Sequence, residues 1–240
     1  MRSGLRRPAR ALGVVITVVA VVAGVTAEAG AAASSGDGAI ARSGVFVAAD
    51  FPAGFRASAP STTSHTDNLR LAKGVDGCNP YVTLQKTLVS LPQARSSSFG
   101  GDGRSISNEV DVFPSEKAAS AALVLYAKPS VVGCLENIFE KQFRQDPDLR
   151  SSLDDVVVRL DRQDISGLGD ENVDYEGSIT LTGTDGSTST VGIGSAAVRV
   201  GPTVDVVVYS TTGVGFTDVL TPAIDASVGR LRSALASSAK

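Results

Sequence analysis

The sequence predicts an α+β fold, in which an antiparallel sheet is covered on one face by helices. Two observations carry this prediction. Helical patterns and strand patterns each occur in runs, without the regular β-α alternation that a parallel sheet requires. Towards the C-terminus, three strand-like segments are joined by tight turns at Asp185-Gly186 and Gly201-Pro202, so they must be antiparallel neighbours. We expect a single domain over residues 45–236, because roughly 200 residues can bury enough surface for one sizeable core.

The first 33 residues have the layout of a secretory signal peptide. Four arginines precede an uncharged run from Ala11 to Ala27, and small residues follow. We expect cleavage after Ala31 or Ala33. An uncleaved membrane anchor is the alternative, because the uncharged run lies at the short end of what spans a bilayer. Residues 34–44 are small and polar, and we expect them to form a flexible lead-in.

Three helices are expected in the middle of the chain. Asn79 as N-cap and Pro80 at the first helical position begin one of them. A second covers Glu116 to Ala127 after a cap at Ser115, and a third runs from about Val131 to Gln145. Apolar residues at i, i+3 and i+4 spacing give the third helix a buried face: Val131, Cys134, Leu135, Ile138, Phe139 and Phe143.

A first group of strands lies on either side of the predicted helices. Residues 100–103 form a glycine-rich hairpin turn, and Ile106 to Phe113 follows as a half-buried strand. In that strand, apolar side chains alternate with Ser107, Glu109 and Asp111. Three consecutive valines predict a well-buried strand over Asp155 to Asp161.

The C-terminal part of the chain predicts a three-stranded meander and a closing helix. Strands around Tyr175 to Leu181, over Thr188 to Val200 and over Thr203 to Thr211 alternate with the two tight turns. A helix near Thr221-Pro222 then carries one apolar face, made of Leu220, Ile224, Val228, Leu231 and Leu235. Because this face needs a surface to cover, we expect the helix to pack on the meander.

Cys78 and Cys134 are the two cysteines of the chain. In an exported protein such a pair is typical of a disulfide, although two free structural thiols are the alternative. Closing a loop of this length would stabilise the fold by about 4 kcal/mol in the chain-entropy model. The bond would join the start of the Pro80 helix to the inner side of the helix over Val131 to Gln145.

The net charge excludes two classes of partner. Without residues 1–33 the chain retains 18 basic and 24 acidic residues, a net charge near −6. Nucleic-acid binding and adhesion to an anionic membrane need a basic surface, and no cluster of lysines or arginines follows Arg10.

Two motifs resemble binding sites but lack the context that those sites need. Gly192 to Ala197 matches the dinucleotide pattern G-x-G-x-x-A, yet no helix can follow it, so small residues of a central strand are the better interpretation. Asp170 to Glu176 matches the first calcium ligands of an EF-hand loop, but glycine and glutamate are missing at the sixth and twelfth positions. A solvated strand face is favoured there, and a weak Ca²⁺ site is the alternative.

No catalytic residue, cofactor-binding residue or metal ligand is expected, and no cofactor. His65 is the sole histidine, and we expect it to be exposed in the Ser/Thr-rich loop from Ser58 to Thr66. Zinc and copper sites use several histidine or thiolate ligands, which this chain does not supply. Paired carboxylates of the glycosidase type remain open, because 24 acidic residues are present and no pair stands out.

Several segments occur in an order that resembles a known group of proteins: Asp50-Phe51-Pro52-Ala53-Gly54-Phe55, Val112-Phe113-Pro114-Ser115, Cys134-Leu135, Gly167-Leu168-Gly169-Asp170-Glu171 and the closing helix over Ile224 to Leu235. This order resembles the small exported α/β modules of actinobacteria, among them the PknH-type extracellular sensor domain of serine/threonine kinases and the LpqN-type envelope lipoproteins. The resemblance implies a non-enzymatic envelope module that binds a ligand between sheet and helices. The chain departs from these families because it has no lipobox cysteine, no kinase domain and one cysteine pair.

These observations predict an exported, disulfide-stapled binding or sensor-like module outside the cytoplasm. Its partner would be a small molecule, a lipid or another envelope ligand, bound between the meander and the helix over Val131 to Gln145. The alternatives are an exported hydrolase that uses paired carboxylates, and an interaction module that docks a partner through an apolar patch or a sheet edge.

Overall fold

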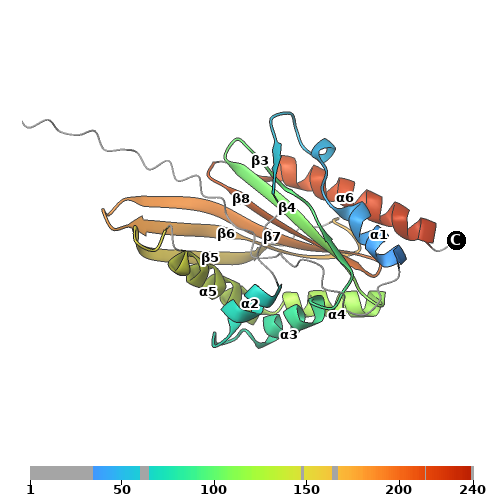
Figure 1. Cartoon of the computed structure of the whole chain (residues 1–240), viewed down its shortest axis with the longest axis horizontal. Helices are drawn as coiled ribbons and strands as arrows, with labels where there is room; N and C mark the ends of the chain where they lie inside the picture. Colours follow the sequence, from blue (N-terminus) through green and yellow to red (C-terminus); the bar gives the residue numbers. More distant parts are fainter. Residues whose placement is uncertain (1–34, 60–64, 147–148, 164–166, 214, 239–240) are drawn as a thin grey trace, which may run out of the picture.

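The computed structural model of the chain describes residues 35–59, 65–146, 149–163, 167–213 and 215–238. At its centre lies an antiparallel eight-stranded sheet with helices on both faces (Figure 1). The strands follow the order β1-β3-β4-β8-β7-β6-β5, and β2 pairs with β4. Their bounds are β1 (Arg56–Ser58), β2 (Gln93–Arg95), β3 (Ser98–Gly101), β4 (Arg104–Val112), β5 (Leu153–Gln163), β6 (Glu171–Gly183), β7 (Thr188–Val200) and β8 (Thr203–Thr211). The predicted α+β class is confirmed.

One face of the sheet carries four helices and the other carries two (Figure 1). We call the two faces the four-helix face and the two-helix face. The four-helix face bears α2 (His65–Ala72), α3 (Asn79–Leu88), α4 (Glu116–Tyr126) and α5 (Pro129–Gln145). The two-helix face bears α1 (Ser35–Gly44), the short 3-10 helix η1 (Ala48–Asp50) and α6 (Thr217–Ser238). The sequence predicted helices on one face, but α1 and α6 cover the opposite face as well, so that β8 is buried on both faces over Thr203–Ser210.

The predicted meander is confirmed. β6, β7 and β8 are antiparallel neighbours, joined by turns in which Gly186 and Gly201 adopt positive φ values of 78° and 56°. Left-handed backbone of this kind favours glycine, which explains the two turn signals in the sequence. β4 then pairs with β8 over nine residues and extends the sheet. β4 is therefore a central strand with covered faces.

Four predicted elements differ from the structure. Residues 35–44 were expected as a flexible lead-in but form α1, because Ile40 and Ala41 pack against the two-helix face. The strand with three valines is the edge strand β5, which is buried at alternate positions only. α6 begins at Thr217, ahead of the expected start near Pro222. The N-cap of α3 is Cys78, one residue before Asn79.

The buried face of α5 is predicted correctly. All six apolar residues from Val131 to Phe143 are buried, and Ser115 caps α4 by accepting a hydrogen bond from the Ala118 amide. Helices α3, α4 and α5 cover one hydrophobic cluster together with β5, β6, β7 and β8. This cluster contains both cysteines and three tyrosines: Tyr81, Tyr126 and Tyr175.

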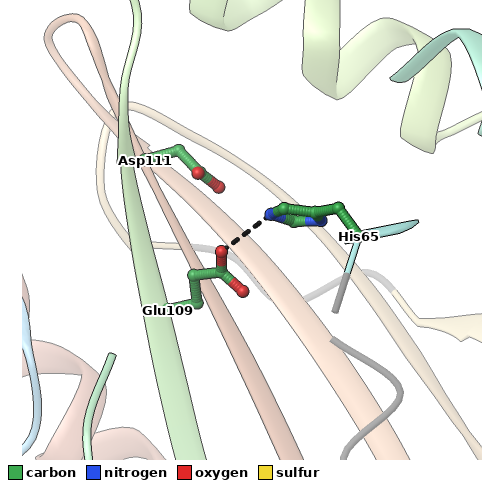
Figure 2. A group of neighbouring side chains, drawn as sticks. All are labelled: His65, Glu109 and Asp111. Carbon is green, nitrogen blue, oxygen red and sulfur yellow. Dashed lines mark hydrogen bonds and ion pairs between the residues drawn. The ribbon is translucent and has the colours of Figure 1, made fainter. Parts of the chain in front are cut away.

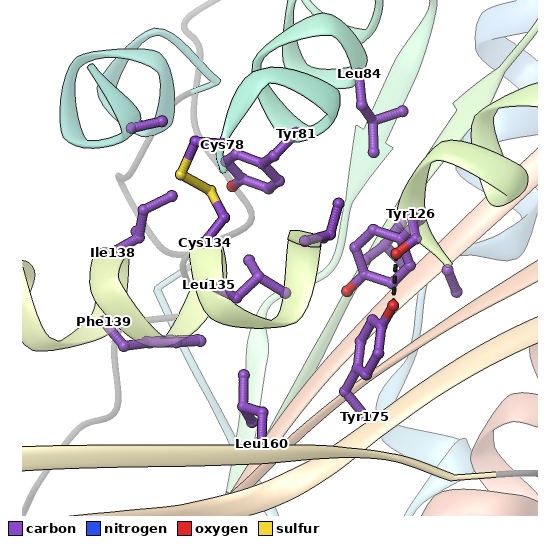
Figure 3. Packing of buried hydrophobic residues seen from close by; sticks show 14 of the residues in the cluster. Cys78, Tyr81, Leu84, Tyr126, Cys134, Leu135, Ile138, Phe139, Leu160 and Tyr175 are labelled. Carbon is purple, nitrogen blue, oxygen red and sulfur yellow. Dashed lines mark hydrogen bonds between the residues drawn. A yellow bond between two sulfur atoms is a disulfide. The ribbon is translucent and has the colours of Figure 1, made fainter. Parts of the chain in front are cut away.

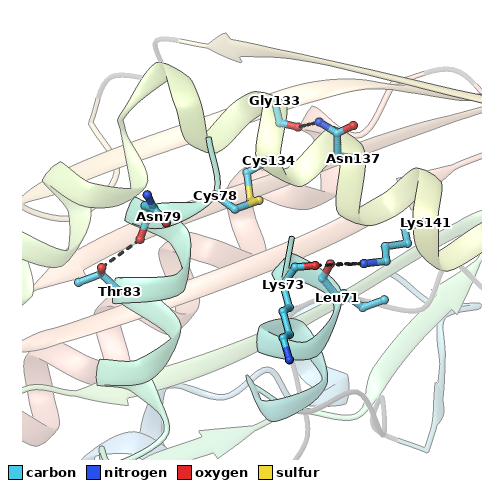
Figure 4. Close-up of a disulfide and its surroundings, with 9 residues drawn as sticks. All are labelled: Leu71, Lys73, Cys78, Asn79, Thr83, Gly133, Cys134, Asn137 and Lys141. Carbon is cyan, nitrogen blue, oxygen red and sulfur yellow. Dashed lines mark hydrogen bonds between the residues drawn. A yellow bond between two sulfur atoms is a disulfide. The ribbon is translucent and has the colours of Figure 1, made fainter. Parts of the chain in front are cut away.

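The disulfide Cys78–Cys134 is present, with the two Cα atoms 4.9 Å apart (Figure 4). Cys78 precedes α3 and Cys134 lies on the inner face of α5, so the bond fastens these two helices to each other. Lys141 Nζ of α5 also donates to the main-chain oxygen of Leu71, 3.0 Å away, at the end of α2. Three helices of the four-helix face are thus tied to one another by side chains.

Polar side chains buried under α6 join the two-helix face to the sheet. Asp205 of β8 accepts from Asn108 Nδ2 of β4 at 2.8 Å and lies 2.5 Å from Ser227 Oγ of α6. Ser227 Oγ also donates to the main-chain oxygen of Gly44 at the end of α1, 2.7 Å away. α1, α6 and two central strands therefore meet at one buried hydrogen-bond network.

The described residues contain helices of up to 22 residues. In that part of the chain no single helix has the length and apolar composition to cross a bilayer. α4 and α5 together meet the criteria of length and composition, but they are bent by 68° at their junction. Both helices pack on the sheet as part of the hydrophobic cluster. The predicted signal peptide over residues 1–33 lies outside the described residues.

Candidate functional site

Two carboxylates on β4 point into the four-helix face of the molecule. Glu109 is 1% exposed and Asp111 is 0% exposed. The sequence pattern indicated a half-buried strand, but α2 and α3 cover the face on which these polar residues lie. Side chains at i and i+2 of a strand share a face, so the two carboxylates are neighbours. They are the acidic pair that did not stand out in the sequence.

His65 is the third member of this group, and its predicted exposure is wrong. It begins α2, is 0% exposed, and lies between β4 and α3. Its Nε2 atom is 2.9 Å from Glu109 Oε1, and its Nδ1 atom is 2.7 Å from Gln85 Oε1 of α3 (Figure 2 shows the ring directed at Glu109, with Asp111 alongside). We call His65, Glu109 and Asp111 the His-Glu-Asp cluster. One potential ligand atom from each residue lies within 4.8 Å of the others.

Arg95 of β2 adds a positive charge to the cluster. It lies opposite Glu109 in the β2–β4 pairing. Arg95 Nη2 donates to Glu109 Oε1 at 3.1 Å, and Arg95 Nε is 3.1 Å from Glu109 Oε2. Glu109 therefore contacts both His65 and Arg95 inside the protein.

The surroundings shift the three titratable groups in different directions. Burial lowers the pKa of His65, but the hydrogen bond and the charge of Glu109 outweigh it, so the pKa of His65 is raised. Burial raises the pKa of Glu109, but His65 and Arg95 outweigh it, so that pKa is lowered. Burial and the charge of Glu109 raise the pKa of Asp111 well above its usual range. The same surroundings therefore shift the pKa values of Glu109 and Asp111 in opposite directions.

Asp111 has fewer hydrogen-bond partners than the other two members of the cluster. Among the described residues, neither of its carboxyl oxygens has a hydrogen-bond partner. The hydroxyl of Tyr81 on α3, in a side chain that is 1% exposed, also has none within the described part of the chain. Buried polar groups without partners each cost about 1–3 kcal/mol, so they are uncommon unless a ligand or water occupies the space beside them.

A cavity lies beside Asp111 and Tyr81. Its volume is ≈ 30 Å³, which is room for one or two water molecules. Its surface is almost entirely apolar, although four residues with polar groups border it, namely Asp111, Gln85, Tyr81 and Tyr126. The other lining residues are Leu84, Leu88, Phe113, Ala122, Leu123, Leu135, Ala197, Val204 and Val206. We call it the aspartate cavity.

A second cavity of ≈ 20 Å³ lies between α5 and the meander, where the sequence predicted a binding pocket. Tyr126 and Leu135 line both cavities and form the wall between them. Tyr126 is held in place because its hydroxyl is 2.8 Å from Ser195 Oγ and its main-chain oxygen accepts from the Tyr175 hydroxyl at 2.5 Å (Figure 3). We call the second space the meander cavity.

The segment Asp170 to Glu176 is a strand face bound by arginines and a tyrosine. Arg199 of β7 contacts both Asp170 and Glu171, at 3.4 Å and 3.0 Å. Glu176 accepts from the Tyr209 hydroxyl at 2.8 Å. Asp174 is 1% exposed, so this side chain does not lie on a solvated face as expected.

Gly192 to Ala197 lies within the central strand β7, as expected from the missing helix. Gly194 is required there because the ring of Tyr209 lies where a β-carbon would be. The sequence motif therefore reflects close packing of a ring on a strand.

No protein-family model matches the sequence, and no curated protein matches it. The crystal structure of the extracellular domain of PknH from Mycobacterium tuberculosis is a weak structural neighbour, with a TM-score of 0.34 and 12% identity, covering 75% of this chain and 81% of that chain. At this TM-score the likeness carries no argument about function.

Proposed function

We propose that the chain is an exported, non-catalytic binding module of the sensor-like type, which holds a small ligand between the four helices and the sheet. One observation carries this proposal. Asp111 and Tyr81 border the aspartate cavity, and their buried carboxyl and hydroxyl groups have no hydrogen-bond partner among the described residues. A mostly apolar cavity in which a few polar groups converge is the usual form of a small-molecule site.

The chemistry of the cavity defines the ligand. Asp111 can accept a hydrogen bond and Tyr81 can donate one, because burial raises the pKa of Tyr81 and keeps its proton in place. A ligand with a hydroxyl or amide head and an apolar body would satisfy both groups and contact the leucines and valines of the wall. An organic anion is disfavoured, because it would meet the cluster's carboxylates.

The small volumes of the aspartate cavity and the meander cavity indicate how a ligand would enter. Ligands of ordinary size occupy sites of about 300–1,000 Å³, whereas each of the two cavities here has room for only one or two waters. A ligand would therefore displace the helices from the sheet and join the two cavities at Tyr126 and Leu135. Because the disulfide fastens α3 to α5, these helices would move as one body.

An extracytoplasmic location agrees with two features. Disulfides persist in oxidising compartments and are rare in the cytosol, and Cys78–Cys134 is fully formed. The N-terminal residues have the pattern of a signal peptide. Both support export of the chain.

The experiment is a thermal-shift screen of the protein, expressed from its full-length chain, against envelope lipids, fatty acids, glycans and small metabolites in EDTA. A ligand at 100 times its Kd stabilises by about 2.7 kcal/mol, which for a domain of this size is a rise in Tm of about 5–10 °C. Tyr81→Phe and Asp111→Asn should each reduce the shift. Asp161→Asn, on the exposed side of β5, is the matched control and should leave it unchanged. Equal shifts in all variants would contradict the site, and no shift with any compound would contradict the function.

A carboxylate-dependent hydrolase is the second candidate. It is favoured by Glu109 and Asp111, whose pKa values are displaced in opposite directions as in acid and base pairs of glycosidases. The two groups are buried, so a substrate would have to reach them through an opening of the helix layer. Turnover of glycoside or ester substrates that is lost in Glu109→Gln would establish this candidate in place of the first.

A further inference from the structure

We propose that the His-Glu-Asp cluster binds one divalent ion of the first-row transition metals. The three side chains supply one imidazole nitrogen and carboxylate oxygens, within 4.8 Å of one another. This mixed ligand set suits ions such as Zn²⁺, Mn²⁺ and Fe²⁺. The proposal does not depend on ligand binding in the aspartate cavity, although Asp111 borders both sites.

The orientation of His65 is that of a metal ligand. Gln85 Oε1 is an acceptor only, so the His65 Nδ1 atom 2.7 Å away carries a proton and donates it. The Nε2 atom faces Glu109 Oε1 as the donor of their hydrogen bond, and a bound ion would take the place of that proton. Metal-bound histidines are usually held in this way, with the second ring nitrogen donating to a carbonyl or carboxylate oxygen.

The distance between His65 and Glu109 also fits. Two ligand atoms bound at about 2.1 Å and at right angles around one ion lie about 3 Å apart. His65 Nε2 and Glu109 Oε1 are 2.9 Å apart in the structure. Asp111 would have to move its carboxylate inwards by less than about 2 Å to complete the set. Its oxygens have no hydrogen bond among the described residues that would resist this movement.

The unpartnered Asp111 carboxyl is the observation that points to an ion. The side chain is 0% exposed and directed into the cluster (Figure 2). A buried carboxyl that serves only the fold normally accepts hydrogen bonds or pairs with a cation. A dication would supply the missing partner, and a water in the adjacent aspartate cavity could supply a fourth ligand.

Arg95 defines which ions the cluster would accept. Its guanidinium contacts Glu109 and offsets part of the negative charge of the two carboxylates. Ca²⁺ and Mg²⁺ are held mainly by charged oxygens and would be disfavoured by this cation. Transition-metal ions also gain from the bond to imidazole, so they should bind in preference. The sequence predicted no metal ligands, because it offers one histidine and no free thiol. In this proposal the carboxylates of Glu109 and Asp111 on β4 supply the ligands that further histidines or thiolates would otherwise provide.

The test uses protein expressed from the full-length chain, treated with EDTA and then freed of the chelator. Because the cluster is buried, the ion is added both to the folded protein and during refolding. Zn²⁺, Mn²⁺, Co²⁺, Ca²⁺ and Mg²⁺ are titrated by calorimetry, and bound metal is counted by mass spectrometry. We expect one equivalent of a transition ion, with Co²⁺ giving the absorption of a nitrogen-oxygen site, and at least tenfold weaker binding of Ca²⁺ and Mg²⁺.

Variants separate a metal site from a structural cluster. Asp111→Asn and Glu109→Gln should weaken binding by at least tenfold, and Gln85→Leu should weaken it by about 10–100-fold through loss of the His65 acceptor. Asp174→Asn is the matched control, since Asp174 is also buried without a partner among the described residues but lies on the other face of the sheet. It should bind metal as the parent does.

Three results would overturn the proposal. They are the absence of stoichiometric metal in the folded parent protein after both procedures, equal binding by Asp111→Asn and the parent, and equal loss in Asp174→Asn. The metal titration of the parent protein uses no variant, so it still tests the proposal if a variant misfolds. No organic ligand is present in these titrations, whereas the thermal-shift screen is run in EDTA, so failure of one proposal is distinguished from failure of the other.

Discussion

Ser227 Oγ of α6 lies 2.5 Å from Asp205 Oδ2 of β8, in the middle of the two-helix face. The same hydroxyl is 2.7 Å from the main-chain oxygen of Gly44. A serine hydroxyl has one hydrogen, so it cannot donate to both oxygens at once. Burial raises the pKa of Asp205 to about 7, and a protonated Asp205 can donate to Ser227 while Ser227 donates to Gly44. The protonated carboxyl thus satisfies the network.

Stability should therefore fall as the pH rises through neutrality. An aspartate in the unfolded chain has a pKa near 3.8, so between pH 4 and pH 7 the folded state retains a proton that the unfolded state has lost. The contribution of Asp205 to the free energy of unfolding should decrease by about 3 kcal/mol between pH 5 and pH 8. In Asp205→Asn the amide can donate to Ser227 at every pH, so this loss should disappear. Urea denaturation of the parent and of Asp205→Asn at pH 5 and pH 8 measures this loss of unfolding free energy. An equal loss in the two proteins would contradict the role given to Asp205.

Removal of the disulfide should lower stability without exposing a thiol. The double variant Cys78→Ala/Cys134→Ala is expected to lose about 4 kcal/mol, or about 8–16 °C in Tm, because the unfolded chain regains the freedom of the open loop. The single variant Cys78→Ser leaves Cys134 at 0% exposure, so labelling of its thiol should require unfolding. Calorimetry with and without reductant gives the measurement. A double variant whose Tm equals that of the oxidised parent would show that the bond contributes nothing.

Leu135→Ala should merge the two cavities into one apolar space. Leu135 is 4% exposed and borders both, so its truncation should cost about 2–5 kcal/mol. Apolar cavities of this kind bind small aromatic molecules. We expect benzene or indole to raise the Tm of Leu135→Ala and to leave the parent unchanged. Val124→Ala, at a 61% exposed position of α4, is the control and should change neither quantity.

Substitution of glycine by alanine should raise stability at two positions and lower it at a third. A β-carbon added at Gly133 of α5 or at Gly229 of α6 would meet no atom of a neighbouring described residue within 4 Å, so alanine should stabilise each helix by about 0.5–1 kcal/mol. In Gly194→Ala the new methyl group would meet the ring of Tyr209, and a loss of about 1–3 kcal/mol is expected. Chemical denaturation of the three variants tests these signs. Equal effects at all three positions would contradict the packing described for Tyr209.

The elements predicted correctly are those whose signals are local. Gly186 and Gly201 mark turns through their own backbone conformation, and α5 carries its buried face within seventeen consecutive residues. α1 could not be predicted in this way. Its Ser/Gly-rich sequence has little helical preference, and it is stabilised by packing on α6, where Gly44 lies close to Leu231 near the opposite end of the chain.

The candidate site was missed for the same physical reason. His65 follows a polar loop sequence, and its burial depends on Gln85 and on Glu109, which is 44 residues away. The alternation along β4 correctly placed Glu109 and Asp111 on one face. Whether α2 and α3 cover that face is decided by the tertiary structure, and no local pattern reports it.

The edge strand β5 limits how this molecule can associate with copies of itself. An exposed edge offers free backbone groups on which further chains can polymerise. Five charged residues lie along β5: Asp154, Asp155, Arg159, Asp161 and Arg162. Side chains of α5 also bind backbone groups of β5, since the amides of Val158 and Leu160 donate to Glu140 and Glu136. Both features oppose the addition of further strands at this edge and the growth of filaments.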